Sequence, residues 1–230
     1  GYNVIVATTT QTGTSTTSIK NYIQNQYDTL QTPLEFVTLV GDANGSVTIP
    51  TFTENLSGYG GEGDHSYTCL EGGDVLSDIH LGRISVSSTT ELETVIDKIV
   101  TYEMIPPTSA DPGWFDRALL VGDPSASGIT TIYVNQWVKN ELLNFGYTQI
   151  DTVWSGNFST AMMNGVGDGI SFFGYRGYWG MSGLNSTNIM YMDNGYELPF
   201  AILLTCDTGT FESDGNCNSE AFLRAPNGGA

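Results

Sequence analysis

Phe200-Ala201-Ile202-Leu203-Leu204-Thr205-Cys206 is an apolar run that ends in a cysteine, and Asp207-Thr208-Gly209 follow it as a turn. A short apolar run before a turn predicts a strand buried on both faces, as in a parallel sheet. In open α/β sheets, sites form beyond the carboxyl ends of the strands. Cys206 is therefore a candidate nucleophile, with backbone N–H donors from the turn beside it. The alternatives are a small buried hydrophobic side chain or one half of a disulfide with Cys217.

Predicted strands and helices alternate along the rest of the chain. The helices include one capped by Ser18 and one opened by a Thr90–Glu93 capping box. This alternation predicts an α/β fold with a mainly parallel sheet covered on both faces. The proline-rich segment 105–113 predicts a boundary between two α/β subdomains, residues 1–105 and 106–230. The predicted strands are 3–6, 36–40, 78–84, 117–121, 148–153, 169–173 and 199–205, and a last helix covers 219–225.

The composition is strongly acidic, with 25 Asp and Glu against 7 Lys and Arg and a formal net charge of −18. Such a charge repels phosphate backbones and anionic lipids, which argues against nucleic-acid and membrane-surface partners. The longest apolar run, 200–204, is too short for membrane insertion. Only 14% of the residues are charged, and a polar surface built from Thr, Ser, Asn and Gly indicates an extracellular protein. The start at Gly1 and the end at Ala230, directly after a helix pattern, lead us to expect a longer precursor.

Residues 43–77 predict a long loop rich in Gly, Asp, Thr and Asn, and loops of that length usually carry function or bind something. Acidic side chains recur from Glu62 to Asp78, and carboxylate oxygens in an extracellular setting suit Ca²⁺. The candidate ligands of this structural calcium are Asp64, Asp74 and Asp78, and no other cofactor is expected. The spacing is not that of an EF-hand, so a solvated acidic loop is the alternative.

Four segments, in order along the chain, resemble the gingipain-type cysteine peptidases of peptidase family C25. The resemblance implies a caspase-like α/β/α sandwich with mainly parallel sheets in two side-by-side subdomains. It also implies a polypeptide substrate and a secreted or cell-surface location in a bacterium. The segments are Val37 to Asp42; Asp78 to Ser85 with Glu91-Leu92, Lys98-Ile99 and Tyr102-Glu103; the Tyr175–Gly180 turn; and Thr205 to Phe211 with Cys217 and Glu220 to Ala225.

The resemblance places the nucleophile at Cys206 and the catalytic histidine in a Tyr-x-Gly-His-Gly turn. Here that turn is Tyr175-Arg176-Gly177-Tyr178-Trp179, so Tyr178 stands at the histidine position and Trp179 at the glycine after it. A tyrosine ordinarily titrates near pH ~10, which makes it a poor general base at neutral pH. We expect backbone donors near Gly177 to hold the oxyanion, and Arg176 and Trp179 to contact substrate.

Two other residue types could assist Cys206. His65, in the predicted loop, could supply a base, whereas His80 sits inside a predicted strand and fits a packed or edge residue. Arg176 could lower the pKa of a neighbouring thiol, or it could pair with one of the many carboxylates.

Two functions therefore remain open. The first is a secreted cysteine endopeptidase, which requires an exposed Cys206. The second is a catalytically silent family member that serves as a cell-surface, adhesive or structural module with an extracellular protein partner. In the second case we expect Cys206 to be packed under Tyr178 and Trp179 or bonded to Cys217.

Overall fold

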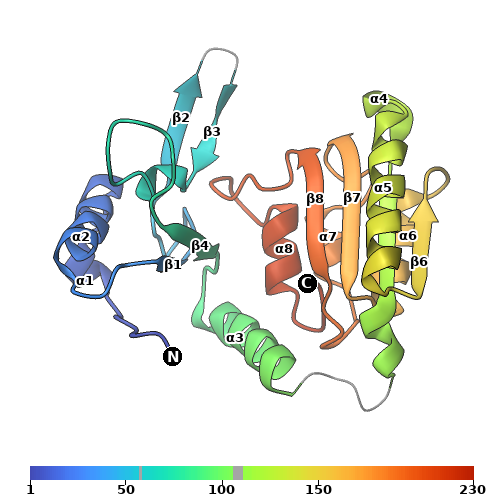
Figure 1. Ribbon diagram of the computed structural model, residues 1–230, viewed down its shortest axis with the longest axis horizontal. Coiled ribbons are helices and arrows are strands. Elements are labelled where there is room, and N and C mark those ends of the chain that lie inside the picture. Colours follow the sequence, from blue (N-terminus) through green and yellow to red (C-terminus); the bar gives the residue numbers. More distant parts are fainter. Residues whose placement is uncertain (57–58, 106–110) are drawn as a thin grey trace. The chain divides into compact units, whose positions relative to one another are not determined.

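The computed structural model describes residues 1–56, 59–105 and 111–230 (Figure 1). It divides into two compact units, Gly1–Thr89 with Thr210–Asp214 and Thr90–Gly209 with Gly215–Ala230. The predicted boundary segment falls largely on residues 106–110, outside the described residues, so a division between 105 and 106 stays a prediction. Both units combine helices with parallel strands, which confirms the predicted α/β class with mainly parallel sheets.

The first unit is built on a parallel pair of strands, β1 (Phe36–Val40) and β4 (His80–Ile84). Helix α2 (Thr16–Thr29) buries Ile19 and Ile23 in a core that also contains Leu39, Tyr67 and Ile79. The cap of α2 is Ser15, not Ser18 as predicted: Ser18 is the third helical residue, and its hydroxyl oxygen accepts a hydrogen bond from the Ser15 N–H at 3.1 Å. A short helix, α1 (Thr9–Thr12), precedes α2.

Two further sequence predictions in this unit are wrong. The predicted loop 43–77 contains an antiparallel hairpin, β2 (Phe52–Leu56) with β3 (Tyr59–Gly63), and a 3-10 turn, η1 (His65–Tyr67). Cross-strand hydrogen bonding stabilises strands that lack a hydrophobic alternation, and this is why the pattern gave no signal. Residues 3–6 form no strand, and the side chains of Val4 and Val6 are exposed.

The second unit contains a four-stranded, all-parallel sheet in the order β6-β5-β7-β8 (Figure 1). Because all four strands run in one direction, their carboxyl ends lie at the same edge of the sheet. The strands are β5 (Arg117–Gly122), β6 (Gln149–Val153), β7 (Phe172–Trp179) and β8 (Phe200–Cys206).

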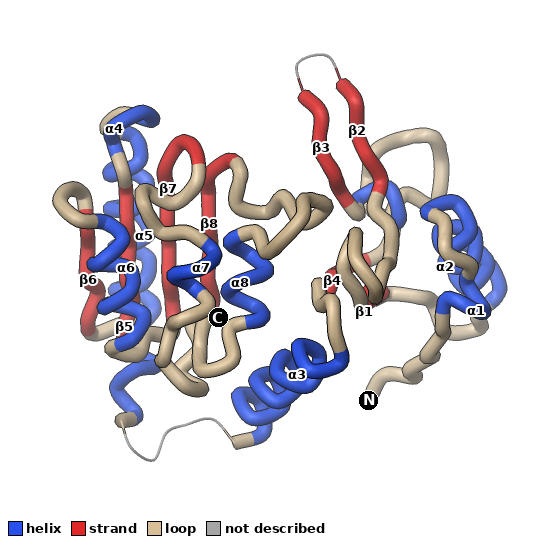
Figure 2. The backbone as a smooth tube through the Cα atoms, turned by 180° about the vertical axis from the view of Figure 1, so that it is seen from behind, coloured by secondary structure: helices blue, strands red, loops and turns tan. Residues whose placement is uncertain are grey.

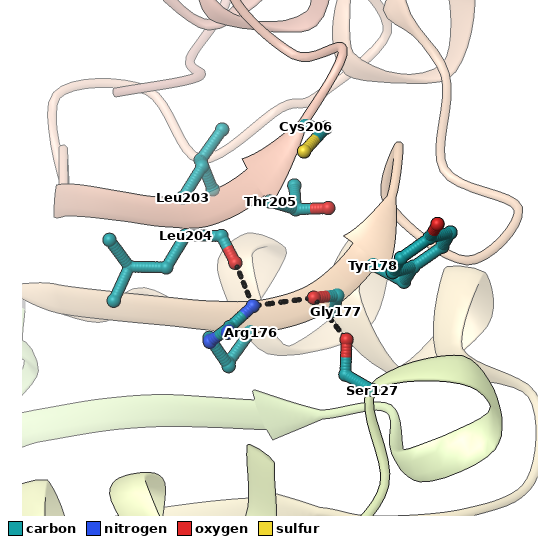
Figure 3. A pocket seen from close by; sticks show the side chains of 8 residues that line it. All are labelled: Ser127, Arg176, Gly177, Tyr178, Leu203, Leu204, Thr205 and Cys206. Atoms are coloured by element: carbon teal, nitrogen blue, oxygen red, sulfur yellow. Dashed lines mark hydrogen bonds between the residues drawn. The ribbon is translucent and has the colours of Figure 1, made fainter. Parts of the chain in front are cut away.

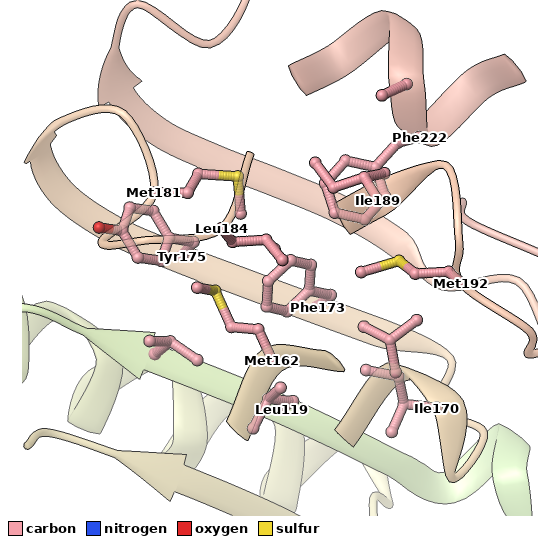
Figure 4. Close-up of a cluster of buried hydrophobic side chains, with 13 residues drawn as sticks. Leu119, Met162, Ile170, Phe173, Tyr175, Met181, Leu184, Ile189, Met192 and Phe222 are labelled. Carbon is pink, nitrogen blue, oxygen red and sulfur yellow. The ribbon is translucent and has the colours of Figure 1, made fainter. Parts of the chain in front are cut away.

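Helices cover both faces of this sheet (Figure 2). On one face, Ala118 and Leu120 of β5 pack with residues of α5 (Thr130–Phe145). On the other, Leu119 and Val121 join the larger core shown in Figure 4, to which α6, α7 and α8 contribute. The alternation along one strand thus produces a three-layer α/β/α arrangement. The remaining helices are α3 (Thr89–Met104), η2 (Pro112–Asp116), α4 (Pro124–Ser127), α6 (Phe158–Gly167), α7 (Ser186–Ile189) and α8 (Asn218–Arg224).

Strand β7 is longer than predicted. The predicted strand ended at Phe173 with a turn from Tyr175 to Gly180, but β7 continues to Trp179. Aromatic residues favour strands, and hydrogen bonding to β8 stabilises β7 beyond Gly174 and Gly177. A register irregularity lies between Arg176 and Trp179. Among the described residues, no helix is long and apolar enough to cross a bilayer.

Candidate active site

The carboxyl ends of β7 and β8 meet at the candidate site. Trp179, the last residue of β7, pairs with Cys206, the last residue of β8. The Gly180 N–H donates to the Cys206 carbonyl at 2.9 Å, and the Thr205 hydroxyl donates to the Gly180 carbonyl at 3.0 Å. These two bonds hold the strand ends in register, as expected for neighbouring parallel strands.

Cys206 is a free and exposed cysteine. The next residue, Asp207, has a φ of 63°, in the left-handed region that only Gly, Asn and Asp enter at modest cost. The chain therefore turns sharply after the thiol. Thr208 then accepts hydrogen bonds at its carbonyl from the N–H and hydroxyl of Ser219, at 2.9 and 2.8 Å, which ties this turn to α8. Backbone outside the common regions is frequent at functional sites.

A cavity of about 610 Å³ opens beside the thiol (Figure 3). Its lining contains one cation and no carboxylate. The lining residues are Ser127, Arg176, Gly177, Tyr178, Leu203, Leu204, Thr205 and Cys206.

Arg176 is anchored inside this cavity by backbone oxygens. Its Nη1 donates to the carbonyls of Gly177 at 2.6 Å and Leu204 at 3.0 Å (Figure 3). In the described part of the chain it forms no ion pair with a carboxylate, which was the alternative expected from the sequence. The guanidinium is therefore a charge directed at the cavity.

Neither aromatic residue covers the thiol. The side chains of Tyr178 and Trp179 are 62% and 66% exposed, so the expectation that Cys206 is packed beneath them is wrong. The alternative of a disulfide between Cys206 and Cys217 is also not borne out, because Cys217 is a free cysteine at the N-terminal cap of α8. Burial raises the pKa of the Cys217 thiol to about 11, which makes it unreactive.

Gly177 occupies a position that only glycine fits. A Cβ at this residue would lie 2.4 Å from the hydroxyl of Tyr175. Its carbonyl accepts from the Ser127 hydroxyl at 2.9 Å and from Arg176, so the backbone is held on both sides. This rigidity suits backbone donors that must keep a fixed direction toward an oxyanion.

A partly buried hydrogen-bond chain that the sequence did not predict lies next to this backbone. The hydroxyls of Tyr175 and Ser182 are 2.7 Å apart, and Ser182 donates to the carboxylate of Asp123. Burial raises the pKa of Asp123, but the hydrogen bonds from Ser125 and Ser182 outweigh it and the net pKa is lowered. Asp123 directly follows β5, and β5 lies next to β7 in the sheet. Its place after a predicted strand was the one feature of the sequence that could have indicated a residue near the site.

The two histidines do not line the cavity. His65 begins η1 in the first unit, and both of its ring nitrogens lie 3.9 Å from the sulfur of Cys69. His80 is an exposed residue of β4 that stacks on Phe36 with ring centroids 5.1 Å apart, which fits the edge position among the two expected roles, packed or edge residue.

The predicted calcium ligands have protein partners. Asp64 forms an ion pair with Arg83 at 2.7 Å, and Asp74 accepts from the Leu76 N–H at 2.9 Å. Hydrogen bonds from the N–H groups of Glu71 and Leu70 lower the pKa of Asp78. Within the described ranges, no three His, Cys, Asp or Glu residues are grouped to hold a metal ion. Calcium binding stays a prediction.

The chain is similar to known cysteine peptidases over most of its length. It is 28% identical over 224 residues to Gingipain R2 and 26% identical over 239 residues to Lys-gingipain, both from Porphyromonas gingivalis. These alignments cover 92% and 96% of this chain but only 29% and 13% of the relatives. The crystal structure of the Arg-specific cysteine proteinase gingipain R superposes with a TM-score of 0.79 at 27% identity, covering 92% of this chain and 49% of that one.

The profile of peptidase family C25 matches residues 1–230, the whole of the sequence. The match agrees with the parallel sheet and with a thiol at the carboxyl end of β8. This chain belongs to peptidase family C25.

Proposed function

We propose that this chain carries the active site of a secreted cysteine endopeptidase, with Cys206 as the nucleophile. The observation that carries the proposal is the free, exposed thiol at the carboxyl end of β8, beside a cavity of about 610 Å³. The chain spans less than a third of the gingipains it resembles, so activity and substrates are proposed for this domain only. The acidic, Thr- and Ser-rich composition supports an extracellular location.

The proposed reaction is an acyl transfer. The Cys206 thiolate attacks the carbonyl carbon of a peptide bond, the C–N bond breaks, and the amine leaves with a proton taken from solvent. Water then hydrolyses the thioester, which releases the carboxylic acid and returns the thiol. Backbone N–H groups near Gly177 would stabilise the oxyanion, and no cofactor is required.

The weak step is the removal of the proton from Cys206. We take Tyr178 to stand at the position of the family's histidine, on the resemblance of its turn; a tyrosine can donate a hydrogen bond but is a poor proton acceptor at neutral pH. The proton therefore passes to solvent, and we expect turnover to be ~10²–10⁴-fold slower than with a general base in place.

The first test is the rate at which Cys206 reacts with iodoacetamide between pH 5 and 9, with Cys206→Ala as the control. Fast labelling well below the ordinary thiol pKa of about 8.5 indicates an activated thiolate and supports the proposal. Slow labelling that rises only above pH 8 contradicts it and favours the catalytically silent family member.

A second test restores the missing base. Tyr178→His should raise peptide hydrolysis by ~10²-fold or more. The matched control is the double variant Tyr178→His/Cys206→Ala, which should be inactive. If Tyr178→His folds and reacts with iodoacetamide but does not hydrolyse peptides, Tyr178 does not occupy the position of a general base.

A further inference from the structure

The charge around the cavity is opposite to that of the whole chain. The sequence has 25 acidic and 7 basic residues, yet the eight lining residues include Arg176 and no acidic residue. The cavity is thus a local exception in a chain whose overall field attracts cations.

Arg176 differs from the other arginines in what it binds. Arg83, Arg117 and Arg224 each pair with at least one carboxylate, at 2.7, 2.7 and 2.8 Å. Arg176 contacts only backbone carbonyls among the described residues.

The hydrogen bonds of Arg176 leave the Nε and Nη2 edge of its guanidinium, which can bind a carboxylate, without a partner among the described residues. The two bonds to the carbonyls of Gly177 and Leu204 both come from Nη1 and use its two hydrogens. A guanidinium has five N–H donors, so three, on Nε and Nη2, have no partner in the described structure. Parallel donors of this kind match the two oxygens of a carboxylate, and anchoring of Nη1 fixes their orientation beforehand.

We propose that Arg176 makes this site selective for a carboxylate on the polypeptide, from an Asp or Glu side chain or from a free C-terminus. The inference rests on the proposed function, because it takes the cavity beside Cys206 as the place where substrate binds. According to this inference, the charge of Arg176 decides which substrates bind. Peptides with Asp, Glu or a free C-terminus should bind more tightly than peptides with Asn, Gln or an amidated C-terminus.

The first experiment compares two alkylating reagents at Cys206. Iodoacetate is an anion and iodoacetamide is neutral. In both reactions the same thiolate attacks the carbon and displaces iodide, so the ratio of the two rates does not depend on the fraction of thiol that is ionised. Cys69, a partly exposed free thiol in the other unit, is the internal reference. We expect the iodoacetate-to-iodoacetamide ratio to be about fivefold higher at Cys206 than at Cys69, as for charges separated by a few ångströms near water.

Variants at Arg176 test the cause of this preference. Arg176→Gln should lower the ratio at Cys206 to that of Cys69, whereas Arg176→Lys, which keeps the charge, should retain part of it. A ratio that is the same in the wild type and in Arg176→Gln overturns the inference, even if Cys206 is reactive.

The second experiment does not depend on the thiol. In the Cys206→Ala protein, calorimetry compares three peptides: one end-blocked with a central Glu, its end-blocked Gln counterpart, and the Gln peptide with a free C-terminus. We expect one of the two carboxylate peptides to bind about fivefold more tightly than the neutral one, and Arg176→Gln to abolish the difference. The tighter of the two identifies the source of the carboxylate. Equal binding of all three overturns the inference, whereas an unreactive Cys206 together with Arg176-dependent binding overturns only the proposed nucleophile.

Discussion

Lys98 should make the stability of the second unit depend on pH in the alkaline range. This side chain of α3 is only 6% exposed, and its Nζ donates to the carbonyls of Phe222, Leu223 and Gly228 at 3.1, 2.9 and 2.9 Å. Two of these carbonyls belong to α8, at its C-terminal turn, where helix carbonyls lack intrahelical partners. Lys98 thus ties α3 to the helix that follows the Cys206 turn.

The size of the effect follows from the burial of the amine. Burial lowers the pKa of Lys98 from 10.5 to about 8. Between these values the folded chain loses the proton while the unfolded chain keeps it, so the unfolded state binds more protons and stability rises with pH. For pKa values of about 8 and about 10.5, the gain from pH 7 to pH 9.5 is about 2 kcal/mol.

The assay is urea unfolding at pH 7 and pH 9.5, followed by tryptophan fluorescence. All four tryptophans lie in the second unit, and the buried Trp114 contacts Tyr102 of α3. The Lys98→Met variant removes the titrating amine at similar side-chain length, so subtraction of its pH profile cancels the other groups. A wild-type profile that parallels that of Lys98→Met would refute the reasoning, because the three carbonyls would then hold the ammonium charged throughout.

The remaining predictions concern the candidate site. Gly177→Ala should destabilise the second unit by about 1–3 kcal/mol in urea unfolding, because its Cβ would lie 2.4 Å from the Tyr175 hydroxyl; an unchanged midpoint would contradict the close contact. In the same urea unfolding assay, Asp207→Val should lower the free energy of unfolding by about 1–2 kcal/mol, because a β-branched residue resists a φ of 63°. Asp207→Gly should leave the free energy of unfolding nearly unchanged, because glycine adopts this φ readily. Cys206→Ala should change stability by less than about 0.5 kcal/mol, because the exposed thiol forms no hydrogen bond with the described residues; a larger loss would make it a packing residue.

Strands with continuous apolar sequences were predictable, and pairings between polar segments were not. The runs at 36–40 and 117–121 became β1, in which only Leu39 is buried, and β5, in which residues 118–122 are buried. The β2–β3 hairpin depends on hydrogen bonds between two segments that have little hydrophobic pattern of their own. The extension of β7 past Phe173 likewise depends on its partner β8, which supplies hydrogen bonds that a one-strand pattern does not show.

In the candidate site, too, features that depend on local sequence were predictable and features that depend on strand order were not. An apolar run ending in Cys206 was sufficient to place the thiol at a strand end, because that inference uses only local sequence. The prediction that this strand is buried on both faces is wrong, since Phe200 and Leu204 of β8 are 69% and 52% exposed. The chain from Tyr175 through Ser182 to Asp123 was not predicted, since it requires β5 to lie next to β7. Strand order is set by how the whole sheet packs, and no short stretch of sequence encodes it.

The position of Cys206 bears on whether the site works chemically. A cysteine kept only for packing is usually buried, because its side chain then contributes as a small hydrophobic group. Cys206 is exposed, precedes a left-handed Asp207 and lies beside the cavity into which Arg176 directs its charge. An exposed thiol adds little to the stability of a fold and is open to oxidation. The position of the thiol therefore supports the proposed reaction at Cys206 over a purely structural role for this side chain.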